Sequence, residues 1–138
     1  MSKFKFLEHT ADVKFQAEGK TLEEAFRSAF QAMKETITKG VKVKSAEEKK
    51  IKIKGSDLSS LLYKFLEEFL YMLDAENFLI SSIKKIKIDK DKFKLNAVVS
   101  GDKASSYKFT NDVKAITYNK MFVRKDKDKF IIQAVLDV

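Results

Sequence analysis

A chain of 138 residues, 44% hydrophobic and 35% charged, is long enough to bury a core, and we expect one domain over residues 1–138. The absence of cysteine excludes a disulfide framework, a thiolate metal site and a thiol nucleophile. No apolar run approaches the length of a membrane span, and the opening MSKFKFLEH lacks the apolar core of a signal peptide. These features predict a cytoplasmic protein with no membrane partner.

The net charge of +8 comes mainly from lysine, because Arg27 and Arg124 are the only arginines. Lysines neutralise phosphates, so a nucleic-acid partner is one interpretation. However, the lysines are spread along the chain, many at alternate positions of expected strands. That pattern is typical of a solvated sheet face and protects sheet edges from aggregation, so we favour it over a nucleic-acid surface.

The first third of the chain predicts two strands and a helix. KFKFLE (3–8) and ADVKFQAEG (11–19) alternate polar and apolar residues, as strands do. A helix is expected from Thr21, because Thr21 and Glu24 have capping-box spacing and apolar residues then recur every three or four positions. Gly40 is a plausible stop for this helix.

The middle of the chain predicts a strand and a second helix. The segment from Val41 to Gly55 alternates most clearly at Ile51 and Ile53. The stretch SDLSSLLYKFLEEFLYMLDAEN (56–77) has a broad apolar stripe at helical spacing, wide enough to lie across a sheet, and Ser56 or Asp57 can cap it.

The remainder predicts hairpins. Expected strands at 82–89 and 92–101, and at 121–125 and 129–138, flank two copies of the pentad DKDKF. These pentads lack the glycine and the final glutamate of a calcium-binding EF-hand loop, so hairpin turns are the better interpretation. Two helices among six or seven strands predict an α+β fold: a two-layer sandwich of one mostly antiparallel sheet with both helices packed on one face.

The stretch LEHTADV holds the single histidine, His9, between Glu8 and Asp12. A Ser-His-Asp triad would have to use His9, but no serine lies in a nucleophile motif. A lone histidine in a polar turn is more typical of a hydrogen-bonding residue than of a catalytic base.

A metal site with oxygen ligands fits these residues better than a catalytic triad does. Asp12 opens a strand, Asp137 is penultimate, and Val138 carries the terminal carboxylate. If the last strand reaches the start of the early one, three anionic groups meet, and Ca²⁺, Mg²⁺ or Mn²⁺ prefer such oxygens. The spacing equally permits a turn cap at Asp12 and a solvated chain end at Asp137. Lys114, near Asp112, could form a surface pair, order the carboxylates or contact a phosphate.

Four colinear stretches together resemble the archease family. They are LEHTADV with GKTLEEAF (7–13 and 19–26), the stretch at 56–77 already quoted, VKAITYN (113–119) and the ending VLDV (135–138). The resemblance spans nearly the whole chain, and it implies a compact α/β sandwich.

The resemblance also implies a role. Archeases are non-catalytic accessory proteins that activate the RtcB-type RNA-splicing ligase, which joins a 3′-phosphate or 2′,3′-cyclic phosphate end to a 5′-hydroxyl end. They promote the GTP- and Mn²⁺-dependent guanylylation of a ligase histidine and multiple turnover, in tRNA splicing or RNA repair. An RtcB-type ligase is therefore the expected partner, with at most indirect or weak RNA contact.

The family's metal cluster falls on Asp12, Asp137 and Val138, with Val138 contributing main-chain oxygen. A divalent cation is the implied cofactor: Ca²⁺ in the isolated protein, Mn²⁺ or Mg²⁺ in function. The family's functional lysine falls on Lys114, and its HTAD histidine on His9. One departure is Asn119, where the family usually has histidine; another is the lack of histidine in GDKASSYKFTND just before.

Two other functions stay open. The first is an RNA-binding module or a chaperone-like modulator of RNA-modifying enzymes, which the positive charge would suit. The second is a small metal-dependent hydrolase that uses His9 and Asp12, for which no preorganised catalytic set is visible in the sequence.

Overall fold

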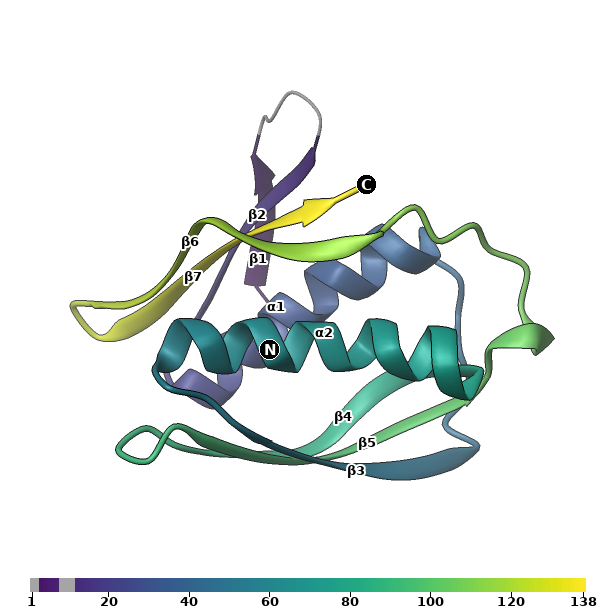
Figure 1. The fold of residues 1–138 in the computed structure, drawn as a ribbon, viewed down its shortest axis with the longest axis horizontal. Helices are drawn as coiled ribbons and strands as arrows, with labels where there is room; N and C mark the ends of the chain where they lie inside the picture. Colours follow the sequence, from purple (N-terminus) through teal and green to yellow (C-terminus); the bar gives the residue numbers. More distant parts are fainter. Residues whose placement is uncertain (1–2, 8–11) are drawn as a thin grey trace. The chain divides into compact units, whose positions relative to one another are not determined.

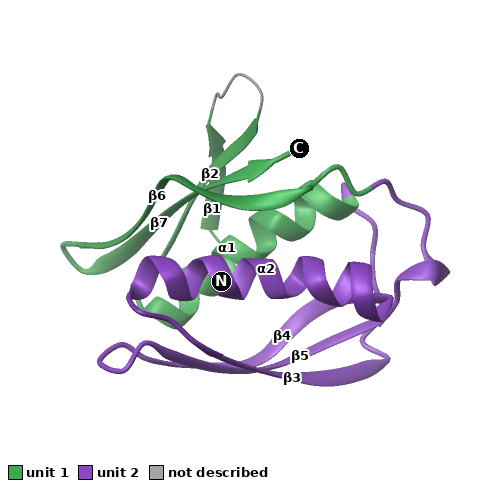
Figure 2. Cartoon of the chain, viewed as in Figure 1, with its two compact units in different colours: residues 1–38, 111–138 green, residues 39–110 purple. Residues whose placement is uncertain are grey.

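The computed structural model describes residues 3–7 and 12–138, and its contacts group the chain into two compact units (Figure 2). Unit 1 consists of residues 1–38 and 111–138, and unit 2 of residues 39–110. Each unit contains one helix and one antiparallel sheet, which are described separately below (Figure 1). The single domain expected over residues 1–138 stays a prediction.

Unit 1 contains a four-stranded sheet in the order β1-β2-β7-β6. Its elements are β1 (Lys3–Leu7), β2 (Asp12–Gly19), α1 (Leu22–Thr38), β6 (Ala115–Asp126) and β7 (Lys129–Asp137). One face of the sheet is apolar, since Phe15 is fully buried on β2 and Leu136 on β7. Helix α1 packs on this apolar face, and the opposite face carries polar residues such as Lys14, Gln16 and Glu18 of β2 together with the fully buried Val135 of β7.

Helix α1 forms where the sequence predicts it. The backbone N–H of Glu24 donates to the Thr21 hydroxyl at 3.1 Å, and the Glu24 carboxylate accepts from the Lys20 N–H at 2.8 Å. The helix ends where Lys39 (φ 51°) and Gly40 (φ 91°) turn left-handed, which glycine does at no steric cost.

Unit 2 contains a three-stranded sheet in the order β3-β5-β4. Its elements are β3 (Glu47–Lys54), α2 (Leu58–Glu76), β4 (Phe78–Asp89), β5 (Lys94–Lys103) and a 3₁₀ turn at Ala104–Ser106. The Asp57 carboxylate caps α2 by accepting from the Ser60 N–H at 2.7 Å, and Asn77 ends the helix in the left-handed region. Side chains of Leu61 and Phe65 on α2 are fully buried.

Both DKDKF pentads form hairpins. Asp89 pairs with Lys94 across the first turn, and Asp126 with Lys129 across the second. The Asp89 carboxylate accepts from the N–H groups of Asp91 and Lys92, so it stabilises a turn, as the sequence predicted for this pentad.

The α+β class, the two helices and the antiparallel pairing are confirmed, but the number of sheets differs from the expectation. The described strands form two sheets rather than one, because among residues 3–7 and 12–138 the strands β3, β4 and β5 pair only with one another. Alternation shows which face of a strand is buried but not which strand lies beside it, so the pattern could not divide the strands. Neither helix in the described part of the chain is long and apolar enough to span a membrane.

The close approach of β2 to α1 depends on Gly19. A Cβ atom at this position would collide with the backbone nitrogen of Ala25 and lie 2.6 Å from the carbonyl carbon of Glu24. We expect Gly19→Ala to lower the free energy of unfolding by about 1–3 kcal/mol, because the helix backbone must shift. Chemical denaturation measures this, with Lys20→Ala as the exposed neighbouring control; equal stability of the two variants would contradict the close packing.

Candidate functional site

Asp12 and Asp137 face each other across two neighbouring strands. Asp12 is the first residue of β2, Asp137 is the last of β7, and the antiparallel register pairs them directly. Directly opposed residues share one face of a sheet, with Cβ atoms about 4.5–5.5 Å apart. Because Phe15 lies three positions after Asp12 on the helix-covered face, both aspartates lie on the opposite face.

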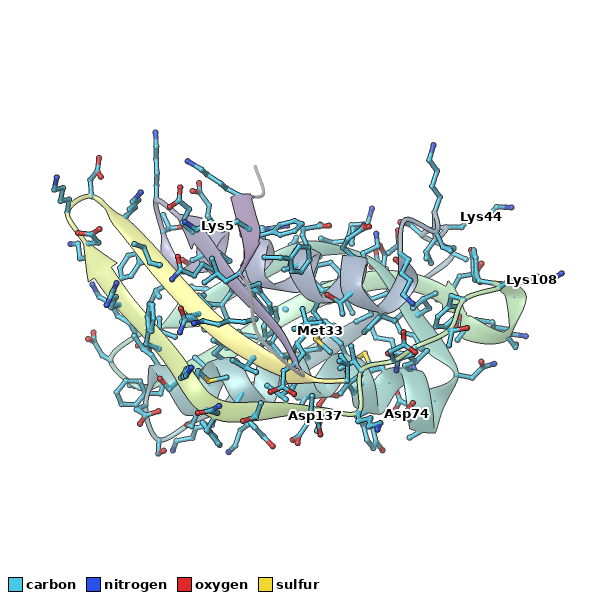
Figure 3. The ribbon with its side chains drawn as sticks, turned by 90° about the horizontal axis from the view of Figure 1, so that it is seen from above. Lys5, Met33, Lys44, Asp74, Lys108 and Asp137 are labelled. Carbon is cyan, nitrogen blue, oxygen red and sulfur yellow. The ribbon has the colours of Figure 1, made fainter. Side chains whose placement is uncertain are left out.

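Lys114 joins the same end of the sheet from β6. Its backbone N–H donates to the main-chain oxygen of Asp137 at 2.7 Å, and Ala115, the next residue, pairs with Asp137. Figure 1 shows the start of β6 beside the end of β7, and Figure 3 labels Asp137 there. Three segments far apart in the sequence therefore meet at one sheet end: the starts of β2 and β6 and the end of β7.

Exposure differs among these residues. Asp12 and Val138 are half-buried, whereas Asp137 and Lys114 are exposed. Val138 directly follows Asp137 and is the next residue along the chain from the carboxylate pair. His9 and its neighbour Glu8 lie outside the residues that the structure describes.

The register that opposes the two aspartates is fixed further along the same face. The Gln16 side-chain N–H donates to the Gln133 side-chain oxygen at 2.9 Å, and Gln133 in turn donates to the Lys120 carbonyl at 2.8 Å. Lys120 has a φ of 58° and lies where the β6–β7 register shifts between Thr117 and Phe122. This polar chain links three strands, and a slip of one residue would break it.

The opposed carboxylates define the chemistry that this end of the sheet offers. Like charges directly opposite each other on a sheet are unfavourable, and a cation between them would remove the repulsion. Within residues 3–7 and 12–138, no three or more His, Cys, Asp or Glu side chains gather closely enough to hold a metal. The available donors are two carboxylates and the main-chain oxygens of Val138, an all-oxygen set that suits a hard cation such as Ca²⁺, Mg²⁺ or Mn²⁺.

The other end of the same face carries an ion cluster that the sequence did not predict. The Glu18 carboxylate lies 2.7 Å from the Lys3 ammonium and 3.0 Å from that of Lys129. Hydrogen bonds from Lys3, and then from Lys129, lower the pKa of Glu18. The three residues come from three strands, and only the register brings them together; Lys3 opposite Glu18 is the pair that a β1–β2 hairpin alignment could have found.

Asn119, which stands where the archease family usually has histidine, lies on β6 beside the register shift. Its backbone N–H donates to the Thr117 hydroxyl at 2.9 Å, and the residue is exposed. It lies two residues beyond the last β6 position paired before the shift, so it is outside the paired sheet end that carries Asp137.

The chain is similar to members of one protein family over nearly its whole length. The model of the Archease protein family (MTH1598/TM1083) matches residues 4–138. Protein archease of Pyrobaculum neutrophilum is 40% identical over 139 aligned positions, which cover 98% of this chain and 95% of the relative. Protein archease of Saccharolobus islandicus is 39% identical over 140 positions and covers all of both chains.

Solved structures agree with the fold. The solution structure of Methanobacterium thermoautotrophicum protein 1598 matches all of both chains with a TM-score of 0.84 at 35% identity. A crystal structure from Thermotoga maritima, described as an archease and possible chaperone, matches 97% of this chain and 96% of its own with a TM-score of 0.68. At 20% identity the second likeness concerns the fold alone. In its described residues this chain is a small α+β protein with two helices and two antiparallel sheets, and it belongs to the archease family.

The Glu18 cluster gives a pH-dependent stability. Because its folded pKa lies below the ordinary value of 4.5, Glu18 stabilises the fold above that pH, and this contribution is lost as the pH falls through the folded pKa. We expect Glu18→Gln to lower the free energy of unfolding by about 0.5–1 kcal/mol at neutral pH, with the difference from the parent protein vanishing in acid.

Chemical denaturation as a function of pH measures this effect. Glu47→Gln is the matched control, because Glu47 is exposed and forms no ion pair among the described residues. A deficit of Glu18→Gln that stays constant down to acid pH would rule out the ion cluster as its cause.

Proposed function

We propose that this protein is a cytoplasmic accessory factor that activates an RtcB-type RNA ligase and performs no chemistry of its own. The observation that carries the proposal is the direct pairing of Asp12 with Asp137, the residue that precedes Val138. Membership of the archease family supports the choice of partner, through the resemblance of the four sequence stretches.

In this proposal, Asp12, Asp137 and Val138 hold a divalent cation: Ca²⁺ in the isolated protein, Mn²⁺ or Mg²⁺ in function. When bound, such an ion supplies positive charge that neutralises phosphate oxygens during nucleotidyl transfer. The chain's own residues present that charge at a sheet end, where strand pairing rather than a loop fixes the spacing of the carboxylates.

Lys114 has a second role in the proposal. Its backbone N–H already orders the Asp137 carbonyl, and its exposed ammonium can reach a phosphate or a carboxylate of the partner. The positive charge of Lys114 at this end of the sheet also limits the net negative charge there, which favours approach to a nucleotide-bound ligase. His9, which lies outside the described residues, is proposed to support this corner.

Metal binding is testable without a ligase. In the presence of EDTA, Asp137→Asn should match or slightly exceed the parent protein in thermal stability, because it removes a like-charge pair. Added Ca²⁺ or Mn²⁺ should raise the melting temperature of the parent protein but not of the variant, because only a folded state that binds a ligand is stabilised by it.

Asp128→Asn is the matched control for this measurement, since it removes the same charge from the exposed β6–β7 turn. It should respond to the metal as the parent protein does. An equal metal response of the parent protein and Asp137→Asn would exclude the proposed site.

The functional test is single-turnover guanylylation of the cognate ligase. We expect the parent protein to stimulate the reaction, and Asp12→Asn, Asp137→Asn and Lys114→Gln each to lose about tenfold or more of that stimulation, as removal of a group from a phosphate-transfer site commonly does. Asp128→Asn should keep it. Full stimulation by both Asp12→Asn and Asp137→Asn would refute the role of the carboxylates.

A further inference from the structure

One face of the three-stranded sheet of unit 2 carries six exposed lysines. The strand register places them in three rows: Lys50 and Lys85 on either side of Val98, Lys52 and Lys87 on either side of Asn96, and Lys54 and Asp89 on either side of Lys94. These residues alternate with Ile51, Leu95 and Val99, which are buried on the face that α2 covers. The lysine face, defined by these six lysines, therefore points away from α2.

The lysine face carries more positive than negative charge, although the exposed Glu48 lies two positions before Lys50 on the same face of β3. None of its six ammonium groups forms an ion pair with any residue that the structure describes, and all six residues are exposed. Lys54 and Lys94 are directly opposed, which destabilises the sheet. The one acidic residue in the three rows, Asp89, uses a carboxylate oxygen to cap the hairpin turn.

Unit 2 also concentrates the charge of the chain. Residues 39–110 contain 16 lysines and 10 acidic residues, so they hold +6 of the total of +8. Several of the acidic residues lie on α2, on the other side of the sheet from the lysine face: Glu67, Glu68, Asp74 and Glu76. Six of the 16 lysines thus lie on the lysine face and four of the 10 acidic residues on the other side of the sheet, so a polyanion is the complementary partner of this face.

The spacing of the lysines suits a row of phosphates. Alternate residues of a strand are about 6.8 Å apart, and the outer strands β3 and β4 are about 9.6 Å apart across β5. Between β3 and β5 the surface forms an open depression of about 350 Å³, lined by Lys52, Ile53, Lys54, Lys94, Leu95 and Asn96. The face offers several point charges around this open depression, and lysine contacts phosphate groups as a point charge.

The composition of the face argues against other partners. Protein interfaces have a buried core enriched in aromatic residues, methionine and arginine, and lysine is depleted there. The nine positions of the three rows contain none of the enriched types. Recognition of single strands relies on aromatic side chains that stack on bases, and these nine positions offer no such platform either.

We propose that the lysine face binds the phosphate backbone of double-stranded RNA without reading its base sequence. A-form RNA has a wide, shallow minor groove, so an open sheet face can reach the phosphates on both sides of it, together with the 2′-hydroxyls. The deeper grooves of B-form DNA suit an open sheet face less well. This binding is independent of the proposed ligase activation, since it uses a different sheet and needs no metal or ligase.

The test is fluorescence anisotropy of a labelled RNA duplex of about 20 base pairs, long enough for a shape-reading protein, titrated with the full chain over a series of salt concentrations. We expect Lys52→Gln/Lys87→Gln/Lys94→Gln to weaken binding at least tenfold at low salt. The slope of log affinity against log salt should fall in magnitude by about 2 to 3, because three phosphate contacts are lost.

The matched control is Lys20→Gln/Lys42→Gln/Lys108→Gln, which removes the same charge at exposed positions outside the lysine face. It should keep the affinity of the parent protein within about threefold, since only long-range attraction changes. Lys52→Arg/Lys87→Arg/Lys94→Arg keeps the charge and should retain binding. Circular dichroism establishes that each variant is folded, and Lys50→Gln/Lys85→Gln replaces the first triple variant if that one unfolds.

Several outcomes would overturn the proposal. Equal losses in the face variant and the control would show attraction by net charge alone. A B-form DNA duplex bound as tightly as RNA would exclude RNA as the specific occupant. Competition by polyglutamate as effective as that by unlabelled RNA would point to an acidic protein surface instead.

Discussion

The antiparallel pairing of β2 with β7 is the constraint on which the site depends. It runs from Asp12 opposite Asp137 to Gly19 opposite Phe130, so it joins residues more than a hundred positions apart. Closing such a distance has an entropic cost, which the buried side chains of Phe15 and Leu136 and the hydrogen bond between Gln16 and Gln133 help to offset. A one-residue slip would move every side chain of β2 to the opposite face, so the same register that forms the core also opposes the two carboxylates.

On the sheet face opposite α1, the carboxylates lie in two different electrostatic environments. Glu18 lies between two ammonium groups, whose hydrogen bonds lower its pKa and make it a source of stability. At the other end, Asp137 is exposed and directly opposes another carboxylate. Natural sequences violate a local rule of stability mainly where function requires it, and a pair of like charges fixed by strand register is such a violation.

The sequence predicted the local elements better than their arrangement. The capping residues Thr21 and Asp57 and the two DKDKF turns act over a few residues, so their patterns were sufficient to place both helices and both hairpins. The division of the strands into two sheets and the cluster of Lys3, Glu18 and Lys129 depend on pairing between distant segments, which alternation does not encode. The meeting of Asp12 with Asp137 was only permitted by spacing, and the resemblance to archeases selected it from the alternatives.

The sequence also did not show where the lysine charges gather in the folded protein. Read along the chain they are dispersed, and the total of +8 gives no direction; in the sheet of unit 2 the alternation of β3, β4 and β5 gathers six of them on one face. The chain thus carries two opposed carboxylates on the sheet of unit 1 and six ammonium groups on one face of the sheet of unit 2. Carboxylates attract cations, whereas ammonium groups attract anions. Divalent cations fill carboxylate sites, yet they also neutralise phosphates and compete with lysine for them. A rising concentration of divalent metal should therefore increase the proposed occupancy of the Asp12–Asp137 site while it weakens the proposed binding of RNA to the lysine face. The two surfaces can thus be distinguished in one unmodified protein.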